Sequence, residues 1–196
     1  MGSIILPVGK SLGPTYNDEG VLEYTELHLG STTEEIGADE STVWRLAHSD
    51  ADAHNEHRFT LDHLRGLAVD DGSVSDVDTA LEKLFKIGGL VRVDLDLDEL
   101  QPLLGRHRLI PTGHAFGNTA ETPDWFGIGR NDEVDINLGA TAYFLWATSH
   151  RDASMWASCA EFTRDLPEVD VDDIAGEFAN ALPIIIAADC GYIETV

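Results

Sequence analysis

Basic residues are scarce in this sequence. Twelve Lys and Arg side chains stand against 36 Asp and Glu, which gives a formal net charge of -24 at pH 7. The lysines are Lys10, Lys83 and Lys86. Nucleic-acid phosphates and acidic lipid surfaces are bound by clustered cations, so we expect neither nucleic acid nor membrane as a partner. The acidity indicates solubility or adaptation to a salty or acid-tolerant cytoplasm. DNA mimicry or binding of a basic partner is the alternative.

Cysteines and long apolar segments are also few. Cys159 and Cys190 lie in apolar surroundings and form no CxxC motif, which predicts two buried, reduced thiols in a cytoplasmic protein. The longest apolar run, residues 182–188, is too short to cross a bilayer. No basic segment followed by a long apolar one marks the N-terminus as a secretory signal. A chain of 196 residues fits one large domain or two small ones.

The sequence contains an internal repeat. Residues 5–15 read ILPVGKSLGPT, and residues 109–119 read LIPTGHAFGNT, with Pro, both Gly and Thr in register. A repeat of this kind sets the architecture of the whole chain. We therefore expect two related units, each entered through a hairpin whose glycines serve its turns.

The first half begins and ends with strand-like segments. Residues 4–8 are apolar, and residues 21–29 alternate in part between apolar and polar side chains, as a strand does. The polar stretch at 30–40 indicates turns. The clean alternation over residues 90–98 predicts a half-buried closing strand.

Helical patterns occupy the middle of the first half. They are expected over residues 42–48, 61–69 and 76–87, where apolar residues recur at helical spacing. Side chains that can cap these helices precede them, namely Asp39 or Ser41, Thr60 and Ser75. Gly88 is expected to end the third helix.

The second half repeats this order. Strands are expected at residues 109–116, 125–128 and 134–138, and helices at 141–148, 153–162 and 172–182. Each half thus reads strand, strand, helix, helix, helix, strand, which is the outline of a winged-helix domain. We predict an α+β protein of two tandem winged-helix-like repeats, residues 1–97 and 107–196. A connector at 98–106 with one helical turn joins them.

The second half also resembles the PqqD-like domains, winged-helix peptide chaperones of the type that recognises ribosomally made precursor peptides (RiPP recognition elements). The similar features are an apolar strand at 134–138, a small turn at Gly139, an A-x-x-x-W segment from Ala142 to Trp146, a third helix at 171–182 and the closing Gly191-Tyr192-Ile193. The first half follows the pattern more loosely. Members of that family usually carry one such domain, whereas this chain has two.

The resemblance implies that a leader peptide adds as a strand beside one strand and the third helix of a repeat. By position, the grooves would lie between residues 23–29 and 77–86, and between residues 134–138 and 173–182. The implied peptide-binding side chains are Tyr24, Glu26, Leu27, Val77, Lys83, Lys86, Val134, Ile136, Asp173 and Glu177. Lys83 and Lys86 share a helix face, which indicates either a basic spot for an acidic partner or solvent-facing lysines near the helix end.

Chemically versatile side chains gather in a histidine-rich stretch, residues 48–57. His48, His54 and His57 are candidate metal ligands, because His with carboxylates can bind zinc or nickel. A solvated polar loop is the favoured interpretation, and we predict no metal and no cofactor. Four tryptophans and one phenylalanine at helical or strand positions are expected to build cores: Trp44, Trp125, Trp146, Trp156 and Phe144.

Two glycine-rich matches near the N-terminus fail in context. Residues 9–13 fit the letters G-x-S-x-G, but Pro14 and Thr15 follow where a nucleophile elbow needs a helix. Gly9-Lys10-Ser11 resembles the end of a phosphate-binding loop. The motif needs a glycine at position 4, however, and that position holds Ile4. No catalytic set is therefore predicted.

The sequence favours a non-enzymatic peptide- or protein-binding module that presents a precursor (leader) peptide to modification enzymes by β-augmentation. One alternative is a winged-helix, transcription-associated regulator that acts through protein partners. Another is a metal-dependent protein that uses the stretch from His48 to His63. No oligomeric state is predicted.

Overall fold

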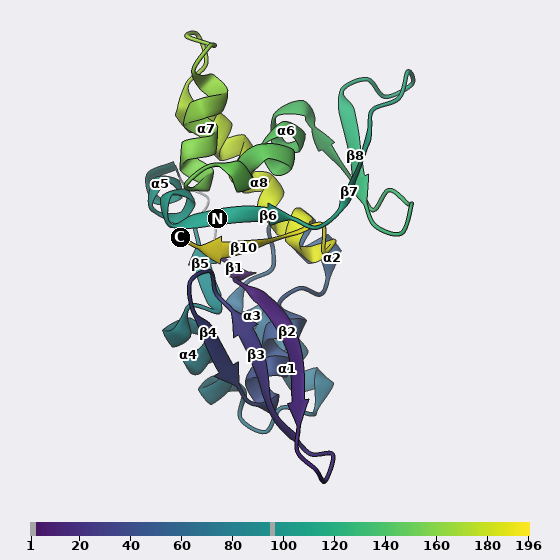
Figure 1. The fold of residues 1–196 in the computed structure, drawn as a ribbon, viewed down its shortest axis with the longest axis vertical. Coiled ribbons are helices and arrows are strands. Elements are labelled where there is room, and N and C mark those ends of the chain that lie inside the picture. Colours follow the sequence, from purple (N-terminus) through teal and green to yellow (C-terminus); the bar gives the residue numbers. More distant parts are fainter. Residues whose placement is uncertain (1–2, 95–96) are drawn as a thin grey trace.

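The computed structural model describes residues 3–94 and 97–196, which form an α+β protein with small antiparallel sheets (Figure 1). This confirms the α+β part of the prediction. The elements of the first half are β1 (Ile4–Pro7), β2 (Lys10–Tyr16), β3 (Leu22–His28), β4 (Thr33–Ile36), α1 (Ala38–Leu46), α2 (Ala51–Asn55), α3 (Leu61–Asp71), α4 (Val77–Ile87) and β5 (Leu90–Val93).

The second half follows helix α5 (Leu97–Arg106) and has the same order of elements. They are β6 (His107–Pro111), β7 (His114–Gly117), β8 (Trp125–Gly129), β9 (Ile136–Gly139), α6 (Ala140–Thr148), a 3-10 turn (Ser149–Arg151), α7 (Met155–Thr163), α8 (Val171–Ala187) and β10 (Gly191–Thr195). The 3-10 turn stands where the first half has α2.

The strand pairing repeats as well. β1 pairs with β5 and β6 with β10, so the first and last strands of each half form an antiparallel ribbon. Pro7 stands opposite Leu90 in one ribbon, and Pro111 stands opposite Gly191 in the other. The remaining strands form two three-stranded meanders, β2-β3-β4 and β7-β8-β9.

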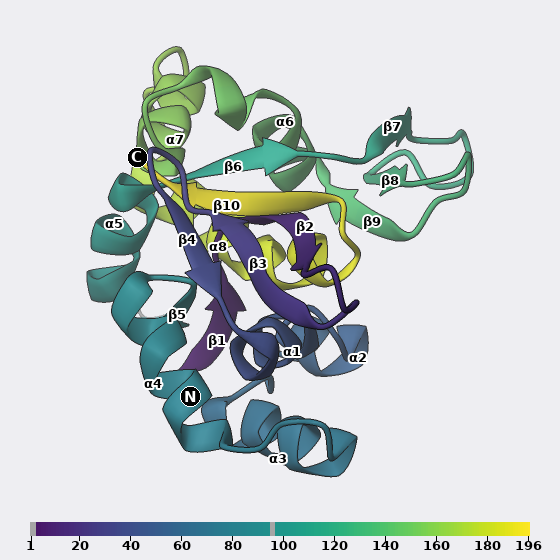
Figure 2. The same cartoon turned by 60° about the horizontal axis from the view of Figure 1, so that its bottom comes forward.

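The two ribbons are in contact with each other. The amide of Gly9, just after β1, donates a hydrogen bond to the carbonyl of Ile193 in β10 at 2.7 Å. Both ribbons contribute to one continuous hydrophobic core, with Ile5 and Leu6 from one and Leu109 and Ile193 from the other. The meander β7-β8-β9 projects away from this centre (Figure 2).

Helix ends follow local sequence rules. Thr60 caps α3 by accepting a hydrogen bond from the His63 amide, and Gly88 ends α4 in a left-handed conformation, both as predicted. Asp76, one residue after the predicted Ser75, caps α4. Helix α1 begins after Gly37, so neither Asp39 nor Ser41 caps it.

Several expected boundaries were wrong. The segment 109–116 forms two strands, β6 and β7, and the turn-rich stretch 30–40 contains β4. The closing strand expected over 90–98 ends at Val93, and residues 95–96 of that prediction lie outside the described residues. The single helical turn expected in the connector is the ten-residue helix α5.

Two glycines share a positive φ but differ in their surroundings. Substituting each one therefore distinguishes the free-energy cost of backbone strain from the cost of a steric clash between the halves. Gly30 and Gly20 both have positive φ, +87° and +76°. A Cβ at Gly30 would lie 2.0 Å from the Thr195 carbonyl oxygen, whereas a Cβ at Gly20 would meet no atom within 4 Å.

We expect Gly20→Ala to lower the free energy of unfolding by about 1 kcal/mol, the backbone cost alone. Gly30→Ala should lower it by roughly 1–3 kcal/mol more, because β10 must move away from the first half. Urea unfolding of both variants measures the difference. Equal losses would show that β10 does not pack at Gly30.

Candidate functional site

The groove expected along residues 23–29 has no free strand edge. β3, which contains Tyr24, Glu26 and Leu27, pairs with β2 on one side and β4 on the other. Leu27 is fully buried in the core. An added peptide strand needs an unpaired edge. A peptide therefore cannot add beside β3, and the groove predicted there is wrong.

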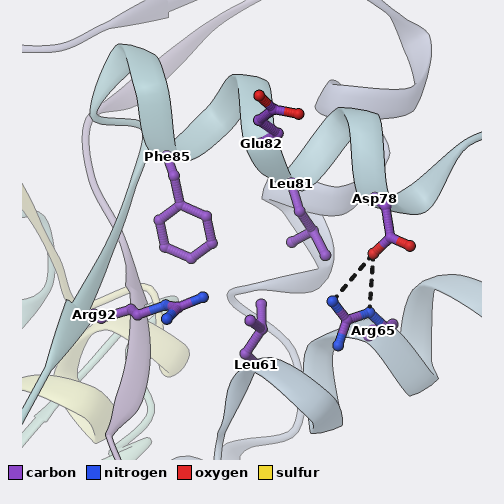
Figure 3. Close-up of a pocket in the computed structure, with 7 residues that line it drawn as sticks. All are labelled: Leu61, Arg65, Asp78, Leu81, Glu82, Phe85 and Arg92. Atoms are coloured by element: carbon purple, nitrogen blue, oxygen red, sulfur yellow. Dashed lines mark hydrogen bonds and ion pairs between the residues drawn. The ribbon is translucent and has the colours of Figure 1, made fainter.

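Helix α4 does line a cleft, but on another side. Leu81 and Phe85 of α4 face Leu61 of α3 across a cleft of about 470 Å³, and Arg92 of β5 closes one end (Figure 3). The Arg92 guanidinium carbon lies 5.2 Å from the Phe85 ring centre. At the opposite end Arg65 donates to the Asp78 carboxylate at 3.1 Å. The cleft is open and apolar, with an Arg65–Asp78 ion pair at its rim.

The other predicted residues of α4 do not form a basic spot. Lys83 Nζ lies 3.1 Å from Glu40 Oε1, and this carboxylate is mostly buried. Lys86 is exposed in the last turn of the helix, and Val77 packs partly against the core. The pairing of Lys83 favours the interpretation as ordinary helix-end lysines.

In the second half the predicted groove has a strand edge. β9, which contains Ile136, pairs with β8 and with no other described strand. Helix α8 lies beside it: a Cβ at Gly139, the last residue of β9, would lie 3.3 Å from Glu177 Oε1. Asp173 and Glu177 are exposed, and Ile136 is half-buried. The structure therefore places the end of β9 next to the turn of α8 that carries Glu177.

An exposed apolar surface lies on the same meander. Trp125 of β8 is 55% exposed and Val134 is 48% exposed. A Cβ at Gly127, two residues after Trp125, would lie 3.0 Å from Val134 Cγ2 and 3.5 Å from Phe116 Cβ. We call Phe116, Trp125 and Val134 the β8 patch. Trp125 also pairs with Gly139 across the ladder, so patch, strand edge and α8 meet there.

The expectation that the aromatic residues build cores holds only in part. Trp146 is buried, and its indole N–H donates to the Cys190 carbonyl at 2.8 Å. Trp44 and Trp156 pack against the core, but Trp125 and Phe144 are exposed. The exposure of Trp125 was not predictable from the sequence, because Trp125 begins a strand whose later residues, Ile128 among them, are buried.

The histidine-rich stretch is not a solvated loop. It contains helix α2, and His54 is fully buried and stacked on Phe59 with ring centres 4.0 Å apart. His48, His54 and His57 each place one ring nitrogen on a different carbonyl, those of Trp44, Ala47 and Asn180. Among the described residues no group of three or more metal-ligating side chains comes together.

Burial favours the neutral forms of two histidines and both cysteines. Burial lowers the pKa of His48 and lowers that of His54 to about 4, although hydrogen bonds to carbonyls oppose the shift in each. Burial raises the pKa of Cys159 to about 12 and that of Cys190 to about 11. Both cysteines are buried and unpaired, as predicted. A thiol with so high a pKa is a poor nucleophile.

Comparison with protein-family models, curated proteins and solved structures gave no match. Within the described residues, every helix is too short or too polar to cross a membrane.

The buried imidazole of His54 makes stability depend on pH. Its folded-state pKa, about 4, lies below the ordinary value of 6.5, so the unfolded chain takes up the proton first and stability falls as pH falls between these values. Between pH 7 and pH 4.5 we expect the wild type to lose about 2 kcal/mol more than His54→Gln. Urea unfolding at both pH values tests this. The other histidines are present in both proteins, so parallel losses would contradict the assignment.

Proposed function

We propose that this protein is a non-catalytic binding module that captures an extended, basic peptide along β9 in its second repeat. The observation that carries the proposal is the unpaired edge of β9 beside both α8 and the exposed β8 patch. A free edge offers main-chain hydrogen bonds, and neighbouring side-chain surfaces give selectivity.

The first repeat explains why one edge is favoured over the other. β4 corresponds to β9 and is also an edge strand, but it carries Glu34 and Glu35 where β9 carries Ile136 and Asn137. Charged side chains on an edge strand discourage pairing with another chain. The second repeat therefore supplies the strand that can be extended.

The charge around β9 sets the chemistry of the peptide. Exposed carboxylates come from the loop before β9 and from the beginning of α8: Asp132, Glu133, Asp135, Asp170, Asp172, Asp173 and Glu177. They attract Lys and Arg side chains of a partner. The exposed indole of Trp125 can in addition hold a cation over its face.

The same geometry agrees with two tandem winged-helix-like repeats of the PqqD-like type, the finer architecture that we propose here. In each repeat a three-stranded meander precedes its helices, and an antiparallel ribbon closes the unit. The peptide between β9 and α8 then takes the place implied for a leader peptide. Presentation of a precursor peptide to modifying enzymes is the role that follows.

Selection from a displayed library of random 15-residue peptides tests the proposal. We expect enrichment of peptides with Lys or Arg and apolar residues, and weaker binding at high salt because surface charges are screened. Trp125→Ala should weaken the binding of a selected peptide by about tenfold or more, because an aromatic anchor is lost.

Val69→Ala is the matched control, since Val69 is 62% exposed but lies on α3 of the first repeat. It should leave the affinity unchanged. Absence of any enriched peptide, or equal binding by the Trp125→Ala protein and the wild type, would refute the proposal.

A further inference from the structure

A second, differently charged cleft lies between the two repeats. It encloses about 420 Å³ and is lined from the first repeat by Lys10, Trp44 and Arg45, and from the second by Arg130 and Tyr192. Gly9, Lys10 and Tyr192 of its lining lie at or beside the hydrogen bond from Gly9 to Ile193 that joins the two ribbons. The cleft therefore exists only where the repeats meet.

The charge of this cleft is opposite to that of the molecule as a whole. Three of the twelve basic side chains line it, in a protein with 36 acidic residues. Asp189 is the one carboxylate among the described residues that line it. Such local concentration of cations is unexpected from the composition alone.

The three cations are engaged to different degrees. Arg130 is held in place by ion pairs with Asp189 and Asp135. Arg45 is 68% exposed, and its Nη2 lies 3.9 Å from Asp71, at the outer limit of an ion pair. Lys10 forms no ion pair with any residue that the structure describes, and its Nζ lies 5.8 Å from the Tyr192 ring centre. Lys10 and Arg45 can thus turn toward an incoming anion.

Two carbonyls at the C-terminal ends of nearby helices already accept hydrogen bonds. The Trp44 carbonyl, in the last turn of α1, accepts a hydrogen bond from His48 Nδ1 at 3.0 Å. The Asp189 carbonyl, just beyond α8, accepts one from Thr112 Oγ1 at 2.9 Å. These bonds reduce the repulsion that free helix-end carbonyls would exert on an anion.

We infer that the cleft binds a small organic phosphate. Lys10 and Arg45 would take its doubly charged phosphate group, because clustered ammonium and guanidinium donors suit phosphate oxygens. The rings of Trp44 and Tyr192 would lie against its organic part. The second copy of the repeat lacks this chemistry, since His114 corresponds to Lys10 and Ala147 to Arg45.

A titration with phenyl phosphate at constant ionic strength, monitored by ¹H–¹⁵N NMR, tests the inference. The Trp44 indole N–H, which donates to the Val8 carbonyl at 3.1 Å, reports from the cleft itself. We expect its resonance to shift in a saturable way at millimolar phenyl phosphate, and phenol to leave it in place. Lys10→Gln should weaken binding by about tenfold, the loss of one charge-assisted hydrogen bond.

Lys86→Gln is the matched control, because Lys86 is exposed on α4 away from the cleft. It should bind phenyl phosphate as the wild type does. Thermal unfolding of both variants checks that they fold as the wild type does. Absence of a saturable shift, equal shifts with phenol, or equal affinity of the Lys10→Gln protein and the wild type would each overturn the inference. Peptide binding at β9 is measured separately, so either site can fail without the other.

Discussion

The antiparallel pairing of the first and last strands of each repeat determines how the other elements can be arranged. β1 with β5, and β6 with β10, close each repeat into a unit. The hydrogen bond from Gly9 to Ile193 and the shared core then hold the two units together. With both ribbons occupied at the centre, the meander β7-β8-β9 is left to project outward, with β9 at its free edge (Figure 2).

The two copies share a backbone plan but have diverged on their surfaces. Tyr24 and Trp125 hold equivalent places in the central strands, yet the first meander ends in an acidic edge and the second in an uncharged one. The cations Lys10 and Arg45 likewise occur in one copy only. Because each difference lies on the surface, it leaves the shared core intact. The duplication thus provides one proposed peptide surface and one proposed anion cleft.

Much of the element order was predictable, because period and capping are local properties. Thr60 and Gly88 mark helix ends through hydrogen bonds and backbone conformation within a few residues. Strand partners and burial were not predictable. Whether residues 24–27 form an edge depends on β2 and β4 pairing with them, and the burial of His54 depends on its stacking against Phe59. The exposure of Trp125 and the presence of Lys10 and Arg130 in one cleft likewise depend on tertiary packing.

Hydrogen exchange of the protein with and without a selected peptide measures whether the peptide adds to β9. We expect the bound peptide to slow the exchange of amides of Ile136–Gly139 in β9, since an added strand takes up their outward-facing hydrogen-bonding groups. Amides of Thr33–Ile36 in β4, the equivalent edge, should be unchanged. Protection of β4 with none in β9, or of neither strand, would contradict addition of the peptide at β9.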